Sequence, residues 1–144
     1  MKREMRPVGE KYTFEEFLDI MKDLCAEDGC PWDRIQTHES LVPCLMDEAQ
    51  EVVQAVENQD IDNLCEELGD VLLQVVMHSE IARKNGTFTI EDVIDGVSRK
   101  MIRRHPHIFG DVIADTPEAS LVLWKQIKAQ EKAEKAARQT HKTS

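Results

Sequence analysis

The sequence predicts an all-α protein, organised as a helical bundle of about five helices. Apolar residues recur at spacings of three and four along most of the chain, and residues typical of helix ends separate these stretches. No segment shows the alternation of apolar and polar residues that indicates a half-buried strand. A chain of 144 residues has the size of one domain. We expect a flexible leader over residues 1–12, a single domain over 13–128 and a charged C-terminal tail over 129–144.

The first helix is predicted to begin after Thr13, because Thr13 and Glu16 have the spacing of a capping box. It should end before Gly29, where this glycine and a nearby proline indicate a turn. Pro43 fits the first turn of a second helix, which we expect to extend to about Asn58.

Asp60 is a suitable cap for a third helix, and Gly86 is a suitable residue to end it. Thr89 and Asp92 open a fourth helix. This helix should end at Arg104, because a His-Pro sequence follows and the residue before a proline disfavours the helical conformation.

The last helix should follow a loop through residues 109–111. Thr116 is placed to cap it, and Pro117 suits its first position. Beyond about Ala129 the sequence loses its apolar face and becomes rich in Ala, Lys and Glu. We therefore expect the helix to fray there.

Two carboxylate pairs of equal spacing are the most informative functional feature. Glu48 and Glu51 lie in the second helix, Glu67 and Asp70 lie in the third, and residues three apart share a helix face. Glu48 falls on the apolar stripe of its helix, and Glu67 and Asp70 form a narrow polar stripe on an otherwise apolar helix. An ionised carboxylate in such a place is costly unless a cation compensates it. A solvated acidic face is the alternative, which we favour for Asp47, Glu57 and Glu66.

The type of ligand indicates the type of cation. Four carboxylates without His or Cys are hard oxygen ligands, which favour Mg²⁺, or Mn²⁺ as a substitute, over Zn²⁺. Mg²⁺ usually keeps several waters and is shared with substrate phosphates, so such a site indicates phosphate chemistry. A carboxylate-bridged redox centre is the alternative, but di-iron bundles add Glu-x-x-His pairs. His78 lies two turns beyond Asp70, too far to complete that pattern.

Composition excludes several classes of function. The formal net charge is −10, and an acidic body argues against binding to duplex nucleic acid. No apolar stretch has the length of a membrane span, and the N-terminus lacks the apolar segment of a signal peptide. We therefore expect a cytoplasmic protein that binds no membrane. The cysteines, which show neither C-x-x-C nor zinc-ligand spacing and suit a reducing compartment, are Cys25, Cys30, Cys44 and Cys65.

A basic cluster closes the fourth helix with Lys100, Arg103 and Arg104. Basic residues at this end of a helix complement its dipole, which is the ordinary explanation. Arginine also binds phosphate through paired hydrogen bonds. Beside a magnesium site that indicates phosphate chemistry, we favour a phosphate clamp.

The apolar surface of the third helix predicts a homodimer. Apolar residues cover most of the circumference of this helix, more than one short set of neighbouring helices can bury. They include Leu64, Leu68, Val71, Leu72, Val75, Val76 and Ile81.

Several segments together resemble the MazG family of nucleoside triphosphate pyrophosphohydrolases. They are GCPWDRIQTHESL at 29–41, D-E-x-x-E at 47–51, E-E-L-G-D at 66–70 and RRHPHIFGD at 103–111. Trp124 and Lys128 match the family's closing Trp-x-x-x-Lys pattern, so the resemblance covers roughly residues 13–128. The family's first motif usually begins Glu-Glu, whereas Asp47 stands first here.

The resemblance implies a MazG-like bundle, completed by dimerisation, with metal-dependent hydrolytic activity. Its members hydrolyse a (deoxy)nucleoside triphosphate to the monophosphate and pyrophosphate, through attack of water on the α-phosphorus. The residues that would bind Mg²⁺ are Glu48, Glu51, Glu67 and Asp70. Either Glu48 or Glu51 would be the general base.

The resemblance also implies which residues contact the substrate. Lys100, Arg103 and Arg104 would neutralise charge on the pyrophosphate leaving group. Trp124 and Lys128 would approach the base and the phosphates, although Trp124 could equally be a core anchor. Two other functions stay open: a non-catalytic nucleotide-binding regulatory module, and a relative specialised for one substrate such as dUTP, dCTP or phosphoribosyl-ATP.

Overall fold

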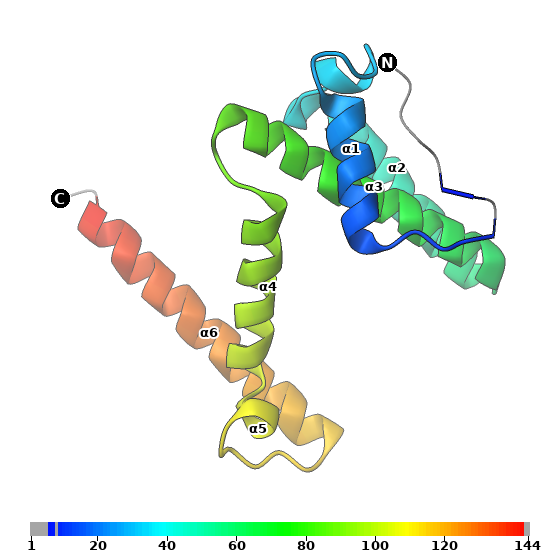
Figure 1. The fold of residues 1–144 in the computed structure, drawn as a ribbon. Coiled ribbons are helices and arrows are strands. Elements are labelled where there is room, and N and C mark those ends of the chain that lie inside the picture. The colour runs from blue at the N-terminus through cyan, green and yellow to red at the C-terminus, as the bar shows by residue number, and fades with distance from the viewer. Residues whose placement is uncertain (1–5, 8, 143–144) are drawn as a thin grey trace. The chain divides into compact units, whose positions relative to one another are not determined.

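The computed structural model describes residues 6–7 and 9–142, and within them every regular element is helical (Figure 1). The all-α prediction is therefore confirmed. None of the helices in this part of the chain is both long enough and apolar enough to cross a membrane. The elements in chain order are α1 (Phe14–Cys25), the 3-10 turn η1 (Asp33–Ile35), α2 (His38–Glu57), α3 (Ile61–Asn85), α4 (Ile90–Arg104), α5 (Pro106–Phe109) and α6 (Pro117–Lys142).

Packing divides the chain into two compact units, residues 1–90 and residues 91–144. In the first unit α2 packs along α3, and α1 packs against α3 (Figure 1, blue, cyan and green). The predicted apolar faces meet there. The buried core of this unit includes Leu18, Met21, Leu41, Ala55, Val76, Met77 and Ala82. The single domain over 13–128 and the charged tail stay predictions.

The leader has local contacts in the residues that the structure describes. The backbone N–H of Arg6 donates to the hydroxyl of Tyr12 at 2.9 Å, and its guanidinium pairs with Glu10 at 3.0 Å. The guanidinium also lies over the Tyr12 ring, 5.4 Å from its centroid. Residues 1–5 and 8 of the predicted flexible leader lie outside the described residues.

The capping box of α1 is confirmed. The hydroxyl of Thr13 accepts from the backbone N–H of Glu16 at 3.2 Å, and the backbone N–H of Thr13 donates to the Glu16 carboxylate at 3.0 Å. These two bonds satisfy donors that the first turn of a helix leaves unpaired. Helix α1 therefore begins at the predicted residue.

The predicted start of the second helix is wrong. Helix α2 begins at His38, so Pro43 lies inside the helix and not in its first turn. A second capping box explains the earlier start, because Thr37 and Ser40 exchange hydrogen bonds of 3.0 and 2.9 Å. The proline removes one helical hydrogen bond, and the rest of the long helix tolerates that loss.

The ends of α3 are confirmed. The Asp60 side chain accepts from the backbone N–H of Asn63 at 3.1 Å, which caps the start of the helix. Gly86 ends the helix with a φ of 72°, a left-handed conformation that a side chain disfavours. Helix α4 then begins at Ile90, directly after Thr89 as predicted.

The C-terminal unit contains two differences from the prediction. A one-turn helix, α5, forms after His105, with Pro106 in its first position. Helix α6 begins at Pro117 as predicted, and the Thr116 hydroxyl accepts from the Ala119 N–H at 3.1 Å. It does not fray at Ala129 but continues to Lys142. Ala, Lys, Glu, Gln and Arg are strong helix formers, which supports this segment without an apolar face.

Candidate metal centre and cationic groove

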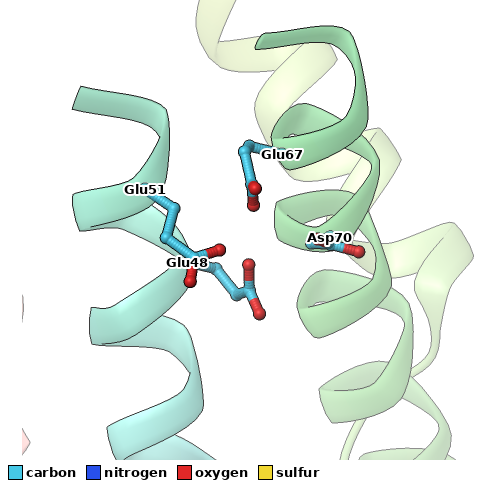
Figure 2. Close-up of side chains that lie close together, drawn as sticks. All are labelled: Glu48, Glu51, Glu67 and Asp70. Atoms are coloured by element: carbon cyan, nitrogen blue, oxygen red, sulfur yellow. The ribbon is translucent and has the colours of Figure 1, made fainter. Parts of the chain in front are cut away.

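The four predicted metal ligands lie together between two helices. Glu48 and Glu51 project from α2, and Glu67 and Asp70 come from the neighbouring α3 (Figure 2). Each side chain offers a carboxylate oxygen, and these four oxygens all lie within 4.8 Å of one another. A short turn joins α2 directly to α3, so the two helices are antiparallel. The two pairs of acids therefore lie opposite each other along the hairpin. The neighbouring acids Asp47 and Glu66 are exposed and lie outside the cluster.

In the part of the chain that the structure describes, no protein cation compensates the charge of the cluster. Glu67 is only 9 % exposed, and one carboxylate oxygen each of Glu48 and Glu67 is buried without a hydrogen-bond partner. Across the described ranges, 6–7 and 9–142, no Lys or Arg forms an ion pair with any of the four acids. Buried, unpartnered carboxylate oxygens are unfavourable unless a cation or a proton occupies the space between them.

The proton affinity of the acids reflects this crowding. A hydrogen bond with Glu51, followed by burial and the charges of Glu51 and Asp70, raises the pKa of Glu67 to about 7. Burial, followed by the charges of Asp70 and Glu51, raises the pKa of Glu48. Both shifts show that a further negative charge is unfavourable here.

The residues fit a divalent metal ion of the hard type. All four donors are carboxylates, and neither His nor Cys belongs to the cluster. Oxygen-only ligand sets are typical of Mg²⁺, Mn²⁺ and Ca²⁺. A cation in this position would satisfy the two unpartnered oxygens and remove the repulsion among the acids.

A cationic groove lies within the second unit, between α4 and α6. It has a volume of ≈ 590 Å³, and its lining includes Lys100, Arg103, Arg104 and Lys128, all of them predicted substrate contacts. The fifth, Trp124, is half-buried and contacts two of these cations. The Arg104 guanidinium carbon lies 5.8 Å from the centre of the Trp124 ring, and the Lys128 ammonium lies 4.6 Å from it. The five predicted residues therefore form one group, in which Trp124 is not fully buried.

Glu131 is an unpredicted member of this groove. One carboxylate oxygen of Glu131 accepts a hydrogen bond from Nε of Arg103. The other oxygen accepts hydrogen bonds from Nε and Nη2 of Arg104, at 3.1 and 2.9 Å. Hydrogen bonds from Arg103, followed by those from Arg104, lower the pKa of Glu131. The available signal was its spacing, since Glu131 lies one helical turn beyond Lys128. The expectation that α6 frays in this region concealed it.

A histidine pair is a second unpredicted feature. Nδ1 of His38, at the start of α2, lies 2.8 Å from Nδ1 of His78 on α3, and the rings are stacked. Burial, followed by the charge of His38, lowers the pKa of His78. The pair links the two helices that carry the acids. No local sequence pattern could identify it, because the two residues are forty positions apart.

Comparisons with known proteins agree on one family. The family model for the MazG nucleotide pyrophosphohydrolase domain matches residues 36–109. The chain is 54 % identical, over 122 residues, to the nucleoside triphosphate pyrophosphohydrolase/pyrophosphatase MazG of Thermotoga maritima, covering 85 % of this chain and 46 % of that protein. It is 42 % identical over 123 residues to the nucleoside triphosphate pyrophosphohydrolase of Escherichia coli, covering 85 % and 47 %. The chain thus spans about half the length of the curated relatives it matches.

A solved structure agrees with the sequence comparisons. The crystal structure of a mazG-related protein from Thermotoga maritima superposes with a TM-score of 0.67 at 30 % sequence identity, covering 80 % of this chain and 98 % of that one. The matched segment of the family model contains all four acids of the cluster. On the combined evidence of motif, family model and fold, the chain belongs to the MazG nucleotide pyrophosphohydrolase domain family.

Proposed function

We propose that this chain hydrolyses nucleoside or deoxynucleoside triphosphates to the monophosphate and pyrophosphate, with Mg²⁺ as cofactor and Mn²⁺ as a possible substitute. The observation that carries the proposal is the group of four carboxylates within 4.8 Å, two of which hold a buried oxygen without a partner. The names of the relatives support the same reaction class.

Glu48, Glu51, Glu67 and Asp70 would hold the cation. When bound, Mg²⁺ supplies Lewis-acid stabilisation of charge on the phosphate oxygens. The protein side chains provide the proton transfer. A water oxygen forms a bond to the α-phosphorus, the bond from that phosphorus to the pyrophosphate oxygen breaks, and a carboxylate takes the proton of the water. Glu48 and Glu51 are the candidates for this base, and Glu51 is the exposed one of the two.

The cationic groove would bind the phosphate chain. Lys100, Arg103, Arg104 and Lys128 supply positive charge and N–H donors that stabilise the leaving pyrophosphate. Trp124 offers a partly exposed aromatic face for the nucleobase. These roles require only hydrogen bonding, charge neutralisation and aromatic stacking.

The test is a substrate panel in ¹⁸O-labelled water. Ribo- and deoxyribonucleoside triphosphates are incubated with Mg²⁺, and with EDTA as the control, and the products are identified. We expect metal-dependent release of pyrophosphate and ¹⁸O in the monophosphate, because water attacks the α-phosphorus. Release of orthophosphate, or ¹⁸O in the pyrophosphate, contradicts the proposed site of attack.

The same panel separates two of the other functions. A regulatory module would bind nucleotide without release of pyrophosphate. A specialised relative would turn over one substrate, such as dUTP, dCTP or phosphoribosyl-ATP, and leave the others intact. A redox centre would require bound iron, whereas the cluster contains only carboxylates.

We also propose that the protein is a homodimer. Large apolar side chains remain exposed on α2 and α3, the helices that carry the acids. An uncovered apolar face of this kind is typical of a subunit interface. We expect sedimentation equilibrium at micromolar concentration to give twice the mass of 16.5 kDa, and the monomer mass would remove this proposal. The exposed side chains are Val42, Met46, Val53, Leu68, Leu72 and Val75.

A further inference from the structure

We infer that Glu131 is a positioning residue, which holds the guanidinium groups of Arg103 and Arg104 in a fixed pair for binding the phosphate chain. This inference rests on the proposed phosphate-binding role of the two arginines. Glu131 itself would not contact the substrate. It would act through the two side chains that do.

The geometry is that of one carboxylate shared between two guanidiniums. Arg103 donates its Nε–H to one oxygen of Glu131, and Arg104 donates its Nε–H and an Nη–H to the other oxygen. The Arg104 and Glu131 side chains are only 15 % and 18 % exposed, whereas Arg103 is 52 % exposed. A partly buried, charge-assisted contact of this kind restricts the rotamers of both arginines.

The bonds to Glu131 leave donors for a phosphate. A guanidinium has five N–H donors, and Glu131 takes one from Arg103 and two from Arg104. Both Nε–H groups are occupied, so the remaining donors lie on the terminal nitrogens. A phosphate can therefore bind the outer edges of the pair without displacing the carboxylate.

Charge explains why an acid is needed among these cations. The groove is also lined by Lys100, Lys128 and Lys132, so the two adjacent arginines lie in a field of like charge. Repulsion would drive their long side chains apart into solvent in the absence of Glu131. The Trp124 ring, with Arg104 over its face, completes the support of that arginine.

The experiment compares Glu131→Gln with a matched control, Glu118→Gln. Glu118 lies in the first turn of α6, is exposed, and is not among the residues that line the groove. Both substitutions remove one negative charge from the same helix. Two quantities are measured: KM and kcat for a nucleoside triphosphate with Mg²⁺, and the Kd of inorganic tripolyphosphate by calorimetry.

We expect Glu131→Gln to raise both KM and the tripolyphosphate Kd by about tenfold, because misplaced binding groups lose much of their effect. The value of kcat should fall as well, because the same arginines stabilise charge that develops on the leaving pyrophosphate. Glu118→Gln should leave all of these quantities within about twofold of the wild type, as expected for an exposed acid outside the groove. If Glu131→Gln strengthens tripolyphosphate binding or leaves it unchanged, the inference is wrong.

A further background separates positioning from a merely structural role. In a protein that carries both Arg103→Ala and Arg104→Ala, Glu131→Gln should have little additional effect on KM or on the tripolyphosphate Kd. The two side chains through which Glu131 would act are absent from that protein. An equal loss in both backgrounds would show a structural role and overturn the inference. If Glu131→Gln does not fold, Glu131→Asp replaces it in the experiment. This variant keeps the charge but has a shorter side chain, so we expect it to raise the tripolyphosphate Kd as well.

The two measurements also separate this inference from the proposed function. If no nucleotide is hydrolysed but tripolyphosphate binding depends on Glu131, the hydrolytic function fails and the positioning role stands. If nucleotides are hydrolysed and tripolyphosphate binding does not depend on Glu131, or the wild type binds no tripolyphosphate, the positioning role fails alone.

Discussion

Glu51→Gln and Asp70→Asn are each expected to reduce metal-dependent turnover by more than about a hundredfold. Substitution of a residue that only supports a metal ligand typically lowers activity or metal affinity by about ten- to a hundredfold, and these two residues would bind the metal directly. Each substitution replaces a carboxylate of the cluster, on α2 or on α3, with a neutral amide of nearly the same shape. The loss should appear in kcat/KM, measured as pyrophosphate release at saturating Mg²⁺.

The matched control for these variants is Glu66→Gln. Glu66 is exposed and lies next to Glu67 in the same helix, but it does not belong to the cluster. It should retain wild-type turnover, and all three variants should keep the wild-type helical content by circular dichroism. Near wild-type rates for Glu51→Gln or Asp70→Asn would show that the altered residue is not a metal ligand.

Glu67→Gln is expected to stabilise the metal-free protein at neutral and higher pH while abolishing turnover. The pKa of Glu67 rises from its ordinary value of 4.5 to about 7 in the folded state. The folded protein thus binds more protons than the unfolded chain between these values, and this contribution to stability, complete below pH 4.5, is lost as pH rises through 7. The raised pKa of Glu48 acts in the same direction.

Urea unfolding in EDTA across this pH range measures the effect. The free energy of unfolding of the wild type should fall with rising pH more steeply than that of Glu67→Gln, whereas Glu66→Gln should follow the wild type. Added Mg²⁺ should stabilise the wild type most at high pH, where the acids are ionised, and should stabilise Glu67→Gln much less. Equal pH slopes for the wild type and Glu67→Gln would contradict the proposed repulsion within the cluster.

Short-range signals in the sequence predicted much of the first unit. The capping residues Thr13, Asp60 and Gly86 each act within a few positions of the chain, and each has its predicted role. The acid pairs were equally readable, because a carboxylate on an apolar helix stripe requires a compensating charge. That argument identified Glu48 and Glu67, the two acids of the cluster with a buried, unpartnered oxygen.

The errors arose where two local signals competed or where a contact joined distant residues. Pro43 suggested a first helical turn, but the box formed by Thr37 and Ser40 starts α2 earlier. Loss of an apolar face suggested that α6 frays, but helix propensity maintains it. The contact of Glu131 with Arg103 and Arg104 joins separate helices, so spacing within α6 places Glu131 beside Lys128 but does not identify its partners on α4.

All four acids come from one helical hairpin, residues 48–70 of a chain in which α2 and α3 are consecutive. Such a hairpin joins residues that are close in sequence, so the entropic cost of bringing the four ligands together is low. Its formation does not depend on contacts with distant parts of the chain. The complete ligand set is also encoded by one short, continuous segment of sequence. A duplication or fusion that moves this segment into a longer polypeptide transfers the complete ligand set, which accords with relatives about twice as long as the region they share with this chain.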